Sequence, residues 1–121
     1  MIIEAKRGDM FYADLTNGIG SEQNGYRPLL IISNDKGNAR SNTVIAAIIT
    51  SQMRSKARLP THCYIKAQQG LSQDSLVLLE QLRTIDKRRL KKYIGTLDGE
   101  TMRKVDRALA VSVGLENMGA K

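Results

Sequence analysis

Short runs of apolar, largely β-branched residues, separated by turn-forming residues, are the feature that most limits the fold of this chain. Leu29–Ile32 and Thr43–Thr50 are continuous apolar runs of strand length. Ser33–Asn38, which lies between them, has the composition of a turn. We predict two buried strands here and further strands over three other segments: Met10–Leu15, His62–Ile65 and Ser75–Leu79, the last able to run on through Arg83.

The last third of the chain has a different periodicity. Asp86 can cap a short helix that extends to Leu90, whereas Tyr93–Thr96 fits either a helix or a strand. Asp98 can cap a longer helix with one apolar face, because apolar residues recur at steps of three and four: Met102, Val105, Leu109 and Val113. Five or six strands followed by one amphipathic helix predict a mainly β fold, a small β-barrel with the C-terminal helix packed on it.

Length and composition limit the class of protein. A chain of 121 residues with 41% apolar and 26% charged residues fits a single globular domain over 1–121, and we expect residues 116–121 to be frayed. One cysteine and one histidine exclude an internal disulfide framework and the usual multi-ligand zinc site. Without an apolar segment of membrane-spanning or signal-peptide type, we expect a soluble cytoplasmic protein with no membrane contact.

The net charge of +7 is unevenly distributed. Residues 36–73 carry six basic side chains and no carboxylate, and residues 83–107 carry nine basic and four acidic side chains. Two basic segments separated by an acidic patch suit a surface that binds a polyanion such as a nucleic acid. A solvated surface kept soluble by its net charge is the alternative.

Common catalytic signatures are missing from the sequence, but two positions stand out. Arg27 follows a glycine-containing loop and opens a buried strand, where Pro28 fixes its backbone. Thr50 ends an almost wholly apolar strand. Both positions place a polar side chain at the rim of a sheet, where a rigid scaffold meets solvent. Arg27 could instead pair with Glu22, and Thr50 could be a turn residue.

Seven short motifs follow one another along the chain: Arg7–Leu15, Gly20–Gln23, Arg27–Asp35, Ala47–Thr50, Leu59–His62, Asp74–Ser75 and Leu79–Asp86. In order and spacing this set resembles the MazF/PemK family of toxin endoribonucleases, above all its Gram-positive MazF members. The resemblance extends to about Leu115, and it is weakest in the loops Gly18–Tyr26 and Ser51–Pro60, where we expect RNA specificity to be set.

The resemblance implies a fold, an activity and partners. The expected protein is a homodimer of SH3-like barrels that cuts single-stranded RNA at short sequences, with no metal or other cofactor. The resemblance also implies a cognate acidic antitoxin whose disordered tail fills the RNA groove. Arg27, Thr50 and Glu22 match the family's catalytic positions. Of the three, Glu22 has the least defined role. The implied RNA-binding residues are Asn34, Arg54, Lys56, Arg58, Ser75 and Gln81. The alternatives are a turn residue for Asn34, strand-end residues for Ser75 and Gln81, and solvated surface charge for the three basic side chains.

Metal-free cleavage of RNA requires attack by the substrate's own 2′-hydroxyl, which leaves a 2′,3′-cyclic phosphate and a 5′-hydroxyl. A guanidinium stays charged and offers several donors in fixed geometry, so Arg27 is expected to stabilise the phosphorane. Two alternatives remain open at this point. A non-enzymatic toxin on the same barrel would bind a protein such as a topoisomerase, and a basic single-strand binding module would hold RNA without cutting it.

Overall fold

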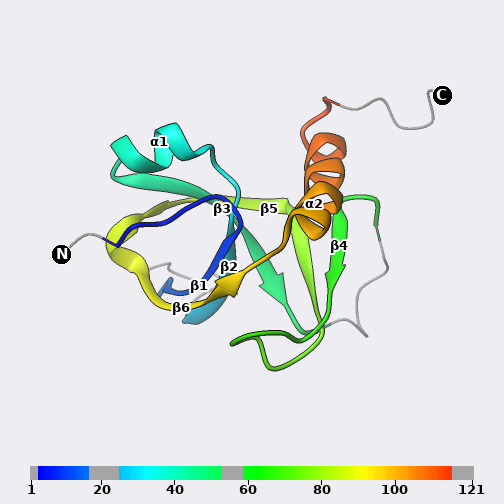
Figure 1. Ribbon diagram of the computed structural model, residues 1–121, viewed down its shortest axis with the longest axis horizontal. Helices are drawn as coiled ribbons and strands as arrows, with labels where there is room; N and C mark the ends of the chain where they lie inside the picture. The colour runs from blue at the N-terminus through cyan, green and yellow to red at the C-terminus, as the bar shows by residue number, and fades with distance from the viewer. Residues whose placement is uncertain (1–2, 17–24, 53–58, 116–121) are drawn as a thin grey trace.

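The computed structural model describes residues 3–16, 25–52 and 59–115, and its strands form one curved sheet (Figure 1). The described strands pair antiparallel in the order β4-β5-β3-β2-β1-β6. The strands are β1 (Asp9–Asp14), β2 (Tyr26–Ile31), β3 (Thr43–Thr50), β4 (His62–Ile65), β5 (Ser75–Asp86) and β6 (Leu90–Thr96). The helices are α1 (Asp35–Arg40), α2 (Gly99–Ser112) and a 3₁₀ helix (Lys87–Arg89).

The predicted mainly β architecture with a C-terminal helix is confirmed. Asp98 caps α2 by accepting a hydrogen bond from the Thr101 amide at 2.8 Å, and Asp86 caps the 3₁₀ helix. The ambiguous segment Tyr93–Thr96 is a strand, the second half of β6.

Both faces of the sheet are buried, which explains the continuous apolar runs. In β2, for example, Leu30 faces one core cluster and Leu29 faces the other. The first cluster includes Val105 and Ala108 of α2, the helix that covers β4 and β5 on the right of Figure 1.

A bulge and a long connection give the sheet its barrel-like shape. The β3–β5 register shifts between Ala47 and Ile48, whose partners are Leu82 and Leu78, and such a bulge bends a strand. Among the described strands the hydrogen-bonded ladder is open, with β4 and β6 as its edges. Residues 66–74, which connect β4 to β5, reach across to β6, where the Gly70 amide donates to the Ile94 carbonyl at 3.0 Å.

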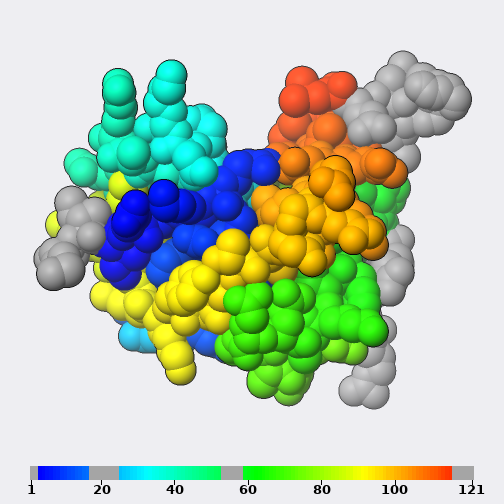
Figure 2. Space-filling model, viewed as in Figure 1, coloured from blue at the N-terminus to red at the C-terminus, as the bar shows by residue number. Residues whose placement is uncertain are grey.

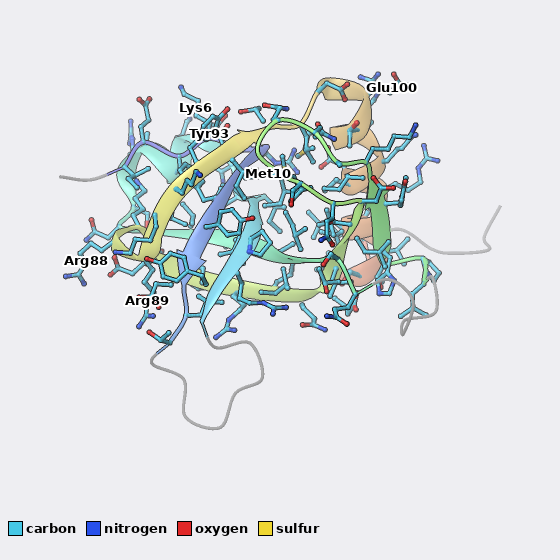
Figure 3. The ribbon with its side chains drawn as sticks, turned by 90° about the horizontal axis from the view of Figure 1, so that it is seen from below. Lys6, Met10, Arg88, Arg89, Tyr93 and Glu100 are labelled. Atoms are coloured by element: carbon cyan, nitrogen blue, oxygen red, sulfur yellow. The ribbon has the colours of Figure 1, made fainter. Side chains whose placement is uncertain are left out.

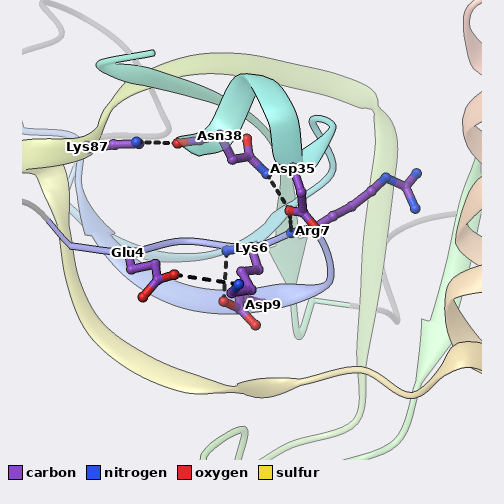
Figure 4. Close-up of polar contacts among 7 residues, drawn as sticks. All are labelled: Glu4, Lys6, Arg7, Asp9, Asp35, Asn38 and Lys87. Carbon is purple, nitrogen blue, oxygen red and sulfur yellow. Dashed lines mark hydrogen bonds and ion pairs between the residues drawn. The ribbon is translucent and has the colours of Figure 1, made fainter. Parts of the chain in front are cut away.

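The prediction of a turn at Ser33–Asn38 is wrong, because α1 begins at Asp35. Asn34 caps this helix by accepting a hydrogen bond from the Gly37 amide at 2.7 Å. Asn38 is buried and donates to the Ser33 carbonyl, and its own carbonyl accepts from the Lys87 ammonium (Figure 4). Two local hydrogen bonds and one long-range contact with Lys87 thus stabilise a short helix in a segment whose composition is typical of a turn.

We expect Val105→Ala to lower the free energy of unfolding by about 2 kcal/mol, because it removes two buried methyl groups and leaves a cavity under α2. Urea denaturation followed by circular dichroism measures the change. Arg107→Ala, at an exposed position of the same helix, is the matched control. Equal stability of the two variants would show that α2 does not depend on this packing.

Candidate active site

A cleft of about 280 Å³ lies where β2 begins and β3 ends. The two strands are antiparallel neighbours, so the start of one and the end of the other meet at the same rim of the sheet. The cleft is lined by residues of β1, β2, β3 and the β4–β5 connection: Tyr12, Tyr26, Arg27, Pro28, Ile49, Thr50, Ser51, Gln52, Leu71, Ser72 and Gln73.

Arg27 and Thr50 come together through the register of β2 and β3. The β2–β3 ladder ends with Leu29 paired to Ile48, and Arg27 and Thr50 each lie two residues beyond this pair at the same rim of the sheet. Side chains alternate along a strand, and Leu29 and Ile48 share one core cluster, so Arg27 and Thr50 belong to that same face of the sheet. The sheet thus brings to one cleft two residues that lie 23 positions apart in the sequence.

Arg27 carries a buried donor that no described residue satisfies. Its Nε is buried and has no hydrogen-bond partner among residues 3–16, 25–52 and 59–115. A buried donor without a partner costs about 1–3 kcal/mol, so such a group usually has a ligand to receive it. A guanidinium in this state is suited to a phosphate oxygen.

Thr50 is 5% exposed, yet it lines the cleft. Its Oγ1 accepts a hydrogen bond from the Gln52 amide at 3.1 Å. This bond orients the hydroxyl and does not use its hydrogen, which remains able to donate to a ligand in the cleft.

Two tyrosines supply the aromatic surface of the cleft. Tyr26, next to Arg27, is 61% exposed, whereas Tyr12 is half-buried against the first core cluster. Phe11 is buried and packs edge-on against Tyr93, with ring centroids 5.7 Å apart. Phe11 therefore belongs to the core, and the aromatic side chains that line the cleft are Tyr12 and Tyr26.

Leu71–Gln73 forms a wall of the cleft that the sequence reasoning missed. Asp74, which follows this wall, accepts hydrogen bonds from the Ala67 amide at 2.8 Å and the Tyr64 hydroxyl at 2.9 Å. These two bonds hold the pKa of Asp74 below its usual value, and the bond from the Ala67 amide has the larger effect. No motif marks this wall in the sequence; only the neighbouring glycine, Gly70, signals a turn there.

The other predicted site residues lie elsewhere or outside the described part of the chain. Ser75 is buried beside the wall and donates to the Gln73 carbonyl at 2.9 Å. Gln81 is half-buried within the β5 bulge. Asn34 caps α1 beyond the opposite end of β2 from Arg27. The remaining predicted residues fall outside the described ranges: Glu22, Arg54, Lys56 and Arg58.

A second, more open hollow of about 520 Å³ carries basic side chains. Arg88 and Arg89 lie at one end of the molecule beside the start of β6 (Figure 3). Arg89 donates to the Asp14 carbonyl at 3.0 Å, and Arg88 pairs with Asp86 at 2.9 Å. Part of the positive charge of residues 83–107 is thus already paired within the protein.

His62 and Cys63 have separate environments, as expected for adjacent residues of a strand. The His62 side chain is 2% exposed and contacts the Glu80 carboxylate through Nε2 at 3.1 Å. Cys63 lies in the first core cluster, and burial raises the pKa of its thiol. Within the described ranges, no three His, Cys, Asp or Glu side chains are grouped to hold a metal ion.

Comparison with known proteins identifies the family. Residues 6–113 match the family described as the PemK-like, MazF-like toxin of type II toxin–antitoxin systems, and the chain belongs to it. Endoribonuclease EndoA of Bacillus subtilis (strain 168) is 55% identical over 111 residues, which cover 91% of this chain and 95% of that protein.

Solved structures agree with this assignment. An endoribonuclease from a mycobacterial species superposes with a TM-score of 0.76 at 26% identity, covering 97% of this chain and 98% of its own. A mycobacterial endoribonuclease in complex with its cognate antitoxin superposes with a TM-score of 0.76 at 27% identity. The match covers 93% of this chain and 98% of that chain. The described helices of this chain include none with the length and apolarity needed to cross a membrane.

We expect the pKa of Asp74 to rise toward 3.8 in Tyr64→Phe but to stay below it, because the Ala67 amide still donates to the carboxylate. Carboxyl chemical shifts followed by NMR between pH 2 and 6 measure this change. The lowered pKa stabilises the fold above pH 3.8, and this contribution is lost as the pH falls through the folded-state value. An unchanged pKa in Tyr64→Phe would contradict the assigned hydrogen bond.

Proposed function

We propose that this chain is the endoribonuclease toxin of a type II toxin–antitoxin pair, which cuts messenger RNA at short single-stranded sequences in the cytoplasm. Its family membership and its identity to EndoA support this activity. The observation that carries the proposal is the cleft in which the Thr50 hydroxyl and the Arg27 Nε, which is buried and has no hydrogen-bond partner among the described residues, lie on one face of the sheet.

The proposed chemistry needs no metal ion. The ribose 2′-hydroxyl gives up its proton as its oxygen attacks the adjacent phosphorus, the bond to the 5′-oxygen of the next nucleotide breaks, and that oxygen takes up a proton. The products are a 2′,3′-cyclic phosphate and a 5′-hydroxyl. Arg27 stabilises the charge that develops on the phosphorane oxygens, since its guanidinium stays protonated. Thr50 orients the 2′-hydroxyl or donates to a non-bridging oxygen, and Glu22 acts at the same step.

RNA recognition is assigned to the surfaces around this cleft. Tyr26 stacks a base next to the scissile phosphate, as exposed aromatic side chains do with single-stranded RNA. Arg54, Lys56 and Arg58, which follow β3, bind phosphates. Ser75 and Gln81 supply further contacts to bases or backbone, and Asn34 does so at the opposite end of β2 from the cleft.

The proposed partners are a second copy of this chain and an acidic antitoxin. A mycobacterial endoribonuclease of the same fold is known in complex with its cognate antitoxin. The net charge of +7 favours an acidic segment that competes with RNA for the same cleft.

Arg27→Ala is expected to lower RNA cleavage roughly 100- to 1000-fold, because the variant loses the donors that stabilise the phosphorane. Cleavage of a long RNA in EDTA, followed by mapping of the fragment 5′ ends, measures both rate and site. Thr50→Val, which removes only the hydroxyl, is expected to reduce the rate at the same sites.

Arg107→Ala serves as the matched control, since it removes an exposed arginine of α2 outside the cleft. Discrete fragments that persist in Arg27→Ala would overturn the proposal. Fragments that disappear from the wild-type reaction on addition of EDTA would instead indicate metal-dependent cleavage.

A substrate with one 2′-deoxy nucleotide on the 5′ side of the mapped cleavage site is expected to resist cleavage, because the attacking hydroxyl is missing. The same substitution on the 3′ side of the bond is expected to leave cleavage intact. Mass spectrometry of the all-ribose products checks for the cyclic phosphate. Cutting of the first oligonucleotide would exclude 2′-hydroxyl attack.

A further inference from the structure

The side chain of Gln69 joins the β4–β5 connection to the edge of β6. Its Nε2 donates to the Thr96 carbonyl at 2.8 Å, and its Oε1 accepts from the Thr96 amide at 3.0 Å. One carboxamide thus makes the pair of hydrogen bonds that a neighbouring strand would make with Thr96. In Figure 2 the residues of this connection, in green, pack directly against the yellow residues of β6.

Two glycines allow this close approach. A Cβ added to Gly95 would overlap the Gln69 side chain, and all three of its nearest neighbours would be Gln69 atoms. A Cβ added to Gly70 would lie 2.9 Å from the Ile94 carbonyl oxygen. The two segments therefore fit only without side chains at these positions.

Gln69 also adopts an unfavourable backbone conformation. Its φ is 53°, and it is the only residue other than glycine with a positive φ in the described part of the chain. It occupies a tight turn in which Gln68 and Leu71 exchange both backbone hydrogen bonds, at 2.9 and 2.8 Å. Glycine would fit this backbone at lower cost, so the glutamine side chain must supply the compensating contact.

The residues that follow this turn form the wall of the candidate active site. Leu71 anchors in the first core cluster, and Ser72 and Gln73 face the cleft opposite the strands that carry Arg27 and Thr50. Asp74 fixes the far end of the wall. The Gln69–Thr96 pair fixes the near end, so the width of the cleft depends on both attachments.

We propose that Gln69 is a positioning residue of the ribonuclease, which sets the Leu71–Gln73 wall against the RNA by pairing with the backbone of Thr96. This inference rests on the proposed function. Gln69 touches neither the reacting atoms nor the RNA, and it acts through the wall. Loosening the wall misplaces the substrate relative to Arg27 and Thr50, which lowers both the rate of cleavage and the preference for the correct sequence.

The test uses Gln69→Gly in the full chain, because glycine keeps the left-handed backbone and removes only the carboxamide. We expect kcat/KM for a short RNA containing the mapped site to fall about tenfold. The preference for that site over a one-base variant is expected to fall as well, a change that a merely destabilised enzyme would not show. Hydrogen exchange is expected to lose protection at the Thr96 amide. Gln68→Ala is the matched control: it removes a carboxamide from the same turn, including its 3.4 Å contact with Gln69 Nε2, but keeps the Gln69 carboxamide that pairs with Thr96.

A double-mutant cycle with Gly95→Ala isolates the contact. Gly95→Ala displaces the Gln69 side chain and is expected to reproduce the loss of sequence preference. In Gln69→Gly/Gly95→Ala the obstructing side chain is absent, so the double variant is expected to be no worse than the single ones. Additive losses would overturn the proposal.

Wild-type kcat/KM and sequence preference in Gln69→Gly would also overturn it, even with lost protection at Thr96, because the pairing would then be structural only. Absence of cleavage by the wild-type chain would defeat the proposed function by itself. In that case hydrogen exchange still decides whether Gln69 orders the wall: unchanged exchange at residues 71–73 in Gln69→Gly would reject that role.

Discussion

The antiparallel pairing of β2 with β3 is the constraint on which the candidate site depends. Leu29 opposite Ile48 sets the register, and both side chains are fully buried. A slip of one residue would turn every side chain of one strand to the other face of the sheet. Because both faces are packed, such a slip would disrupt two cores at once, so the relation of Arg27 to Thr50 is fixed by the interior of the protein.

The cleft is built from two kinds of structure, a rigid floor of strand ends and a wall formed by a connecting segment. The floor consists of strand ends, whose positions follow from the sheet ladder. The wall, Leu71–Gln73, belongs to a connection without a ladder of its own, and side-chain hydrogen bonds from Gln69 and Asp74 hold it at both ends. The same connection covers the edge of β6, so one segment both completes the barrel-like shape and forms a wall of the cleft.

The arginines at the surface and the arginine in the cleft differ in whether they are paired. Arg88 is paired with Asp86, and this contact lowers the pKa of Asp86 to about 2. Arg7 pairs with Asp106 of α2 at 2.5 Å. Arg27 differs from both, since its Nε lacks a partner among the described residues. The excess of basic residues favours polyanions in general, whereas the buried guanidinium of Arg27 marks the proposed phosphate position.

Several features could be predicted from local sequence alone. β3, β4 and the cap of α2 were predicted correctly, because continuous apolar runs and a capping aspartate act through neighbouring residues. Arg27 and Thr50 could also be recognised as candidate site residues, since each is a polar residue at the end of an apolar strand. Their roles, like those of the predicted RNA-binding residues, stay predictions.

Only the tertiary structure decided the remaining features. Ser33–Asn38 has turn composition, yet contacts from Arg7 and Lys87 make part of it helical. The bulge in β5, the pairing of Gln69 with Thr96 and the cleft wall join residues far apart in the sequence. Local sequence specifies strands and caps through short-range sterics and hydrogen bonds, whereas the choice of which strand ends meet depends on the packing of the whole sheet.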